Sequence, residues 1–232
     1  MAGTLHLLSA GSIRRGVSAV IALFEQVGGA RVEVVFTSAP KVRQRLLAGE
    51  RWDVALASTA ALDALAAGGR LDTSTRIRVG SAPMAVAMRT GLPVPDLSTV
   101  EAFTAAMRAA DGVACNEGSS GLHALQVIEQ LGLRDRPGPE IFVCASGAQV
   151  FERIATSEGA IYGLVNVTNI ADQVAAGAPL RLAAPLPEGL QNVTTYEAAV
   201  VSGCAEAALG GRFVAMFATP PARCLLSDAG VE

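Results

Sequence analysis

Charged and aromatic residues are scarce in this sequence. Only 17% of its 232 residues are charged and 4% are aromatic, whereas 51% are hydrophobic. A chain of this composition is too apolar to be disordered, and it can bury a core as one large domain or as two smaller ones. The net charge of −3 and the lack of any basic run exclude nucleic acid as an expected partner.

Long apolar runs are also missing. No stretch reaches the length of a membrane-spanning helix, so no membrane span is expected. The N-terminus lacks a basic segment followed by a long apolar core, and no signal peptide is predicted. We therefore expect a cytoplasmic protein, or a periplasmic one if a native signal peptide has been removed. Only in the second case do we expect an ABC permease as a partner.

Cysteine and histidine are few and scattered. The four cysteines form no Cys-x-x-Cys pair, and no histidine lies near any of them. Metal ligands come in such spaced clusters, so we expect neither a metal site nor a cofactor. His6 falls inside the first apolar stretch and is predicted to pack in the core.

The N-terminal stretch combines a short strand, a small-residue turn and a helix. Leu5–Leu8 indicates a buried strand, residues 9–12 (Ser-Ala-Gly-Ser) a tight turn, and the following apolar residues recur at helical spacing. The unpaired N–H groups and the dipole of such a helix start attract anions. Ser9 and Ser12 are therefore candidate ligands, with Arg14 adding a positive charge. The alternative is that Ser12 only caps its own helix.

The same strand–turn–helix pattern recurs along the chain. In the first part it places Ser38 and Ser58 at strand ends, with Lys41 in the following helical turn. Pro40 fits the first turn of the second helix, which makes Ala39 the expected N-cap, and alanine has no group to cap with. Strands that alternate with helices predict a mainly parallel sheet, whose ligands gather at the carboxyl ends of the strands.

Two long strands suggest that the chain crosses between two lobes. Residues 76–89 and 194–201 are β-like over an unusual length. We expect one lobe from residues 1–80 and 196–232 and a second from residues 81–195. In the second lobe the small-residue turns before helices provide further candidate ligands, namely Ser119, Ser120, Ala148 and Asn166.

The order of these motifs resembles the type II periplasmic solute-binding proteins, and specifically the molybdate-binding family. The matching landmarks are Ser-Ala-Gly-Ser12, Val-Phe-Thr-Ser38, Asp-Val-Ala-Leu-Ala-Ser58, Ser-Ser-Gly121 and Tyr-Gly-Leu-Val165. They span nearly the whole chain, although each motif is short. The resemblance implies an α/β fold of two lobes, each a mainly parallel sheet flanked by helices, with a small anion held in the cleft between them.

The resemblance also assigns ligands position by position. Ser12 matches the first serine ligand of the family, and the second falls at or next to Ala39, where Ser38 would have to substitute. The family's tyrosine corresponds to Asn166, and its backbone ligands fall near positions 120 and 148. Two of three side-chain ligands therefore differ. This difference, together with Arg14 and the other cations near the turns, suits a polycarboxylate better than a tetrahedral metal oxyanion.

An enzymatic alternative stays open, because aconitate isomerases resemble the same family. The chain would then be a cofactor-independent isomerase of an unsaturated polycarboxylate. Such a reaction needs a proton carrier. His123, near the start of a second-lobe helix, and Glu117, in the loop before it, are the candidates. Without such chemistry both are ordinary surface residues of a binding protein.

Overall fold

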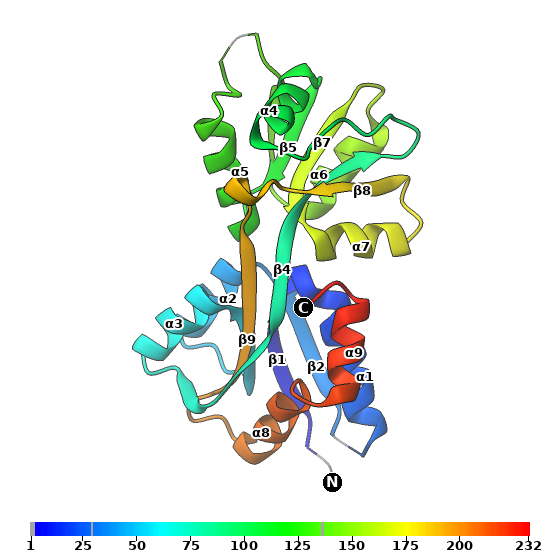
Figure 1. Ribbon diagram of the computed structural model, residues 1–232. Helices are drawn as coiled ribbons and strands as arrows, with labels where there is room; N and C mark the ends of the chain where they lie inside the picture. Colours follow the sequence, from blue (N-terminus) through cyan, green and yellow to red (C-terminus); the bar gives the residue numbers. More distant parts are fainter. Residues whose placement is uncertain (1–2, 29, 136) are drawn as a thin grey trace. The chain divides into compact units, whose positions relative to one another are not determined.

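The computed structural model describes residues 3–28, 30–135 and 137–232, and it divides the chain into two compact units (Figure 1). Unit 1 comprises Met1–Ala82 and Thr194–Glu232, and unit 2 comprises Pro83–Val193. The chain passes between them twice, within β4 (Leu71–Arg89) and at the start of β9 (Val193–Val201). Unit 2 is thus one continuous segment inserted into unit 1.

The sheet of unit 1 has the strand order β2-β1-β3-β9. β1 (Leu5–Ala10) runs parallel to both β2 (Val32–Thr37) and β3 (Val54–Ser58), whereas β9 is antiparallel to β3. The crossover from β1 to β2 and the crossover from β2 past β1 to β3 run in opposite directions along the sheet. Because both are right-handed, their helices cover opposite faces. Figure 1 shows this arrangement for α1 on one face and α2 and α3 on the other; their bounds are Arg14–Gln26, Ala39–Leu47 and Thr59–Ala67.

The last two helices of the chain complete the core of unit 1. They are α8 (Ala207–Met216) and α9 (Pro220–Asp228), and α9 packs along α1. The helices approach closely at Gly16, where an added Cβ would meet a methyl carbon of Leu226 at 3.0 Å. The first helix of the sequence is therefore covered by the last.

Unit 2 has the strand order β4-β7-β5-β6, with β8 paired to β4. Its other strands are β5 (Gly112–Asn116), β6 (Glu140–Cys144), β7 (Ile161–Asn166) and β8 (Leu180–Pro185). β5 is parallel to β6 and β7, and β4 is antiparallel to β7 and β8. Two cores lie on opposite faces of the sheet. One includes α4 (Val100–Ala109) and α5 (Ser119–Gln130), the other α6 (Gly147–Thr156) and α7 (Val167–Ala175).

This architecture confirms the α/β class and the type II fold expected from the sequence. Each unit has a mainly parallel sheet between helices, and in the described part of the chain every antiparallel pair includes β4 or β9. No helix in the part of the chain that the structure describes is long and apolar enough to span a membrane.

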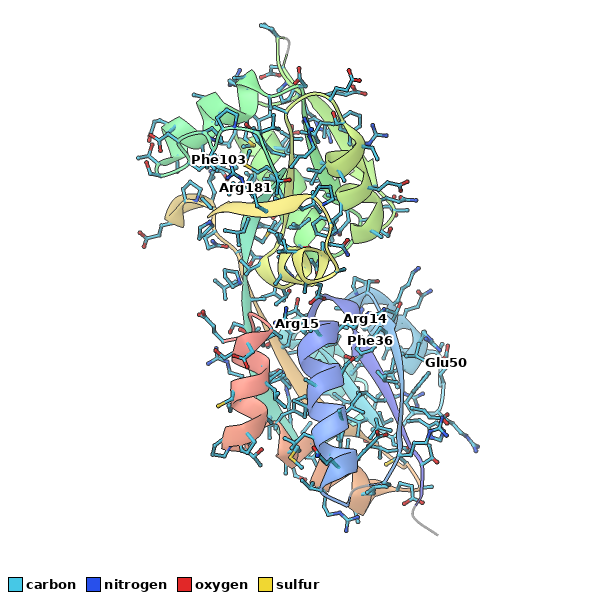
Figure 2. The ribbon with its side chains drawn as sticks, turned by 90° about the vertical axis from the view of Figure 1, so that its right-hand side faces the viewer. Arg14, Arg15, Phe36, Glu50, Phe103 and Arg181 are labelled. Atoms are coloured by element: carbon cyan, nitrogen blue, oxygen red, sulfur yellow. The ribbon has the colours of Figure 1, made fainter. Side chains whose placement is uncertain are left out.

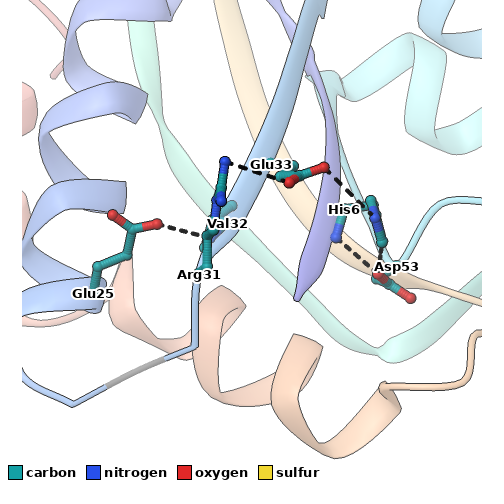
Figure 3. Close-up of polar contacts among 6 residues, drawn as sticks. All are labelled: His6, Glu25, Arg31, Val32, Glu33 and Asp53. Atoms are coloured by element: carbon teal, nitrogen blue, oxygen red, sulfur yellow. Dashed lines mark hydrogen bonds and ion pairs between the residues drawn. The ribbon is translucent and has the colours of Figure 1, made fainter. Parts of the chain in front are cut away.

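The prediction that His6 packs in the core is wrong. Its side chain is 51% exposed, and Nδ1 lies 3.1 Å from Oδ2 of Asp53 (Figure 3). The same carboxylate oxygen accepts the backbone N–H of His6 at 2.7 Å. His6 pairs in register with Glu33 of β2, so a charged neighbour shares its face at the amino end of the strands. The other residues of β1 are buried, and the strand is exposed only at this position.

Candidate functional site

Three helix starts of unit 1 lie side by side at the carboxyl ends of parallel strands. β1 leads into a 3₁₀ turn (Gly11–Ile13) and α1, β2 leads into α2, and β3 leads into α3. The register pairs Ala10 with Thr37 and Ser9 with Leu56, which aligns these ends. We call residues 10–14, 37–41 and 58–59 the unit 1 edge. Within the described residues, no side chain caps any of these helix starts.

Ser12 does not cap the first helix, so the alternative interpretation of this residue is wrong. The turn after Gly11 tightens into a 3₁₀ turn that contains Ser12, so Ile13 becomes the N-cap of α1. The Ser12 hydroxyl instead lies 2.7 Å from the hydroxyl of Tyr196. Ser9 was expected in the turn, but β1 extends past it. It is buried in the strand, and its Oγ donates to the carbonyl of Ala10 at 3.2 Å.

The second helix, α2, starts one residue earlier than predicted. Ser38 is the N-cap of α2 and Ala39 is its first residue, although Ser38 makes no cap bond. Proline suits any first-turn position, because the N–H that it lacks has no partner inside the helix. The helix can therefore begin before Pro40. Ala39 is buried, while Ser38 and Ser58 are half-buried at the unit 1 edge.

The unit 1 edge includes two cationic side chains, those of Arg14 and Lys41. The guanidinium of Arg14 stacks on the ring of Phe36, 4.4 Å from its centroid, and Figure 2 shows the two side chains together at the start of α1. Lys41, the only lysine of the sequence, is exposed in the first turn of α2. Arg15 is directed elsewhere, because its guanidinium donates to the carbonyl of Asp228 in α9. Arg14 and Lys41 thus add full charges to the positive ends of two helix dipoles.

Unit 2 repeats the arrangement with α5, α6 and α7. Asn116 of β5 pairs with Cys144 of β6, and Ala114 pairs with Gly163 of β7, so these three strands also end together. We call residues 116–121, 144–149 and 166–169 the unit 2 edge. Asn169 Nδ2 and Asn116 Nδ2 lie 3.9 and 4.0 Å from the position that a Cβ on Gly147 would take. Side chains of the first and third turns therefore approach Gly147 at the start of α6.

The start of α5 depends on both the side chain and the backbone of Asn116. Its Oδ1 accepts the N–H of Gly118 at 2.6 Å, and a Cβ on Gly121 would come within 1.5 Å of its carbonyl oxygen. The helix begins at Ser119, so Ser119 and Ser120 lie in its first turn and not in the expected turn before it. Gly121 allows this first turn to pass the carbonyl of Asn116. Ser120 is buried in that turn.

The other two helix starts of unit 2 differ in capping. Ser146 caps α6 by accepting the N–H of Gln149 at 3.3 Å, and Ala148 is exposed. Asn166 is the buried N-cap of α7 but makes no cap bond to that helix. Thr168, in the first turn of α7, is buried, and its Oγ1 has no hydrogen-bond partner among the described residues.

The two candidate proton carriers lie in or beside α5. His123 is half-buried, and its Nε2 lies 2.9 Å from the carbonyl oxygen of Leu190. A carbonyl only accepts, so Nε2 carries the proton and Nδ1 of a neutral His123 keeps a lone pair. Glu117 is exposed in the preceding loop, where its backbone N–H donates to the carbonyl of Cys144 at 3.1 Å.

Both edges present hydrogen-bond donors and positive dipole ends, which suit an anion. The described ranges contain no group of three His, Cys, Asp or Glu side chains that could hold a metal ion.

The sequence alone did not identify Asn116, Thr168 or Tyr196 as candidate site residues. Thr168 stands in a recognisable turn before a helix, but no local signal marks Tyr196, whose partner is 184 residues away.

Comparisons with known proteins agree with this geometry. A family model described as bacterial extracellular solute-binding protein matches residues 5–232. An aconitate isomerase from a Pseudomonas species is 30% identical over 132 residues, which cover 54% of this chain and 50% of that protein. The matched segment thus spans only half of that relative.

Two solved structures share the fold at low sequence identity. The periplasmic molybdate-binding protein of Azotobacter vinelandii superposes with a TM-score of 0.76 at 18% identity, covering 98% of each chain. The sulfate-binding protein SubI of Mycobacterium tuberculosis gives a TM-score of 0.77 at 15% identity, covering 98% of this chain and 86% of its own. At these identities the likeness establishes the fold alone.

Proposed function

Since this chain belongs to the bacterial extracellular solute-binding protein family, we propose that it binds a small anion held jointly by the unit 1 edge and the unit 2 edge. The observation that carries the proposal is the set of adjacent helix starts at parallel strand ends in each unit. Among the described residues, no side chain caps α1, α2, α3 or α5. Each such start stabilises a nearby anion by about 0.3–1 kcal/mol when exposed. In this proposal β4 and β9 act as the hinge.

The proposed ligand is a polycarboxylate in preference to molybdate. Ala39 offers no hydroxyl where the molybdate-binding family has a serine, and Asn166 replaces its tyrosine. Arg14, held on the ring of Phe36, and Lys41 supply separate charges for separate carboxylates. The sequence likeness to an aconitate isomerase points to the same ligand class.

A ligand panel tests this proposal. Molybdate, sulfate, citrate, cis-aconitate and trans-aconitate are compared by thermal shift and by calorimetric titration. Since a ligand at about 100 times its Kd adds roughly 2.7 kcal/mol to stability, specific binding is readily seen. We expect the carboxylates to stabilise the protein more than the inorganic oxyanions. A large shift with molybdate and none with any carboxylate would refute the ligand class.

Lys41 provides a direct probe of the unit 1 edge. As the only lysine, it is the one side-chain amine that an amine-reactive reagent can modify. We expect trans-aconitate to protect Lys41 from modification, as read by peptide mass spectrometry. The N-terminal amine serves as the internal control, and equal protection of both amines would argue against binding near α2.

Isomerisation is the second candidate function, because 132 residues of the chain are 30% identical in sequence to an aconitate isomerase. A base removes a proton from a carbon next to the double bond, the double bond shifts, and a proton returns to another carbon. Nδ1 of His123 or the carboxylate of Glu117 would carry this proton, and helix-start N–H groups would stabilise the enolate-like charge. Such a base contributes about 10²–10⁴-fold in rate.

Proton NMR in D₂O distinguishes the two functions. With cis- or trans-aconitate an isomerase incorporates deuterium, and His123→Ala or Glu117→Gln abolishes the exchange while the ligand still stabilises the fold. A binding protein incorporates none, and both variants change affinity alone.

The structural neighbours include the substrate-binding domain of an ABC transporter, so we also propose a periplasmic location and a permease partner. Co-purification with the membrane fraction would test the permease partner.

A further inference from the structure

Tyr196 lies directly behind the unit 1 edge. It pairs in register with Ser58, so it sits where β3 passes into α3. Its side chain is only 1% exposed and belongs to the core of unit 1. The hydroxyl at the end of this buried ring meets the hydroxyl of Ser12 at 2.7 Å. A core residue of β9 thus reaches the turn that precedes α1.

The chemistry of the two hydroxyls favours Tyr196 as the donor of this hydrogen bond. A phenolic O–H is more acidic than the O–H of serine and is the stronger donor. When Tyr196 donates, the Ser12 oxygen is the acceptor and its own proton is left for another acceptor. Neither the 3₁₀ turn that contains Ser12 nor the following α1 takes a cap bond from its side chain.

The residues beside Tyr196 hold β9 in place. The carbonyl of Thr195 accepts the hydroxyl of Thr59 at 3.4 Å. On the other side, the carboxylate of Glu197 pairs with Arg76, whose guanidinium also lies 2.7 Å from Asp63 of α3. The two residues that flank Tyr196 in β9 therefore both connect this strand to α3.

We propose that Tyr196 is the positioning residue for Ser12, orienting the serine proton toward the anion. This inference rests on the proposed function of the unit 1 edge. Hydrogen bonds in a chain strengthen one another, so an anion that accepts from Ser12 also strengthens the bond from Tyr196. A preset hydroxyl also avoids the entropy loss of ordering it upon binding.

A double-mutant cycle tests the role. Tyr196→Phe, Ser12→Ala and the double variant are titrated calorimetrically with trans-aconitate and with molybdate. We expect Tyr196→Phe to raise the Kd about tenfold, which corresponds to about 1.4 kcal/mol, and to cause no further loss once Ser12 is alanine. Tyr162→Phe, which changes the only other tyrosine, is the matched control and should bind like the wild type.

A spectroscopic measurement keeps the test independent of variant stability. With two tyrosines in the sequence, ¹³Cζ labelling gives two signals that Tyr162→Phe assigns. We expect the Tyr196 signal of the wild type to shift when ligand is added, and this shift to disappear in Ser12→Ala.

Three results would overturn the inference. The first is an unchanged affinity in Tyr196→Phe. The second is a loss of affinity from Tyr196→Phe that is as large in the Ser12→Ala background as in the wild type. The third is a Tyr196 signal that does not shift when a ligand is shown to bind. If the wild type binds neither probe, the proposed function fails and this inference fails with it.

Discussion

Two buried hydroxyls at these edges have opposite surroundings. Tyr196 meets Ser12 at 2.7 Å, whereas Oγ1 of Thr168 has no partner among the residues described. A buried hydroxyl left without a hydrogen bond costs about 1–3 kcal/mol of stability. Thr168 lies in the first turn of α7, where an anion at the unit 2 edge would provide the missing acceptor. We therefore expect its hydroxyl to serve ligand binding at the expense of the unliganded fold.

Replacing Thr168 with valine separates the two effects. The variant keeps the shape of the side chain and removes the unpartnered hydroxyl, so the unliganded protein should gain about 1 kcal/mol in free energy of unfolding. Its affinity for trans-aconitate should fall. Urea unfolding and calorimetric titration measure the two quantities.

Thr104→Val is the matched control for this change. The hydroxyl of Thr104 already donates to the carbonyl of Val100 at 2.6 Å inside α4. This variant should gain no stability and should bind normally. A Thr168→Val protein with wild-type affinity would show that the hydroxyl does not contact the ligand.

The buried thiol of Cys115 makes stability depend on alkaline pH. Burial, followed by the charge of Cys144, raises the pKa of Cys115 from 9.0 to about 11. Between these values the unfolded thiol ionises while the folded thiol keeps its proton, so the free energy of unfolding falls as pH rises. This contribution is fully present below pH 9.

Urea unfolding between pH 8 and pH 11 under reducing conditions measures the effect. Cys115→Ala should lose part of the decline seen in the wild type. Cys224→Ala removes an exposed thiol and should keep the wild-type slope. Parallel slopes for all three proteins would contradict the assignment.

At the scale of the elements, the start of α5 depends on one missing side chain. A Cβ at Gly121 would stand 1.5 Å from the carbonyl oxygen of Asn116, a distance that no rotamer change can relieve. Gly121→Ala should therefore cost about 3 kcal/mol, the upper part of the range for overpacking. It should also weaken anion binding by displacing the turn that holds Ser120.

Gly211→Ala is the control, because nothing lies within 4 Å of its added Cβ in α8. Alanine in a helix interior should stabilise the protein by about 0.5–1 kcal/mol. Thermal unfolding compares both variants with the wild type. A Gly121→Ala protein as stable as the wild type would mean that the turn can move away from Asn116.

The same elements show how far sequence can predict this fold. Alternating apolar strands and helical spacing were sufficient to predict the α/β class and the order of strands and helices. The helix starts were harder. The 3₁₀ turn at Ser12 and the early start at Ser119 depend on backbone contacts that no local pattern encodes. The partner of Ser12 lies on β9, so only the assembled sheet of unit 1 brings the two together.

At the scale of the molecule, unit 2 is a candidate for independent folding. Residues 83–193 are continuous, contain two cores of their own, and keep the part of β4 that pairs with β7 and β8. The fragment should show a cooperative thermal transition by circular dichroism. A transition without cooperativity would mean that unit 2 needs unit 1 to fold.

Unit 1 should tolerate removal of the insertion. Its two cut ends lie close together, because the hydroxyls of Ser81 and Thr195 are 3.4 Å apart. A short Gly-Asn link between Ala82 and Thr194 should therefore give a folded protein. If the anion is held jointly, both halves should fold but bind trans-aconitate far more weakly than the whole chain. Full affinity in either half would contradict joint binding.

The covering of α1 by α9 has a consequence for synthesis on the ribosome. β1, β2 and β3 emerge early, yet β3 acquires its neighbour β9 only after all of unit 2 has been made. The packing face of α1 stays uncovered even longer, until α9 leaves the exit tunnel. During that interval the nascent chain exposes an open strand edge and an apolar helix face, both of which invite aggregation. Unit 2 can complete its own fold first, so the earliest residues translated are among the last to reach their native contacts.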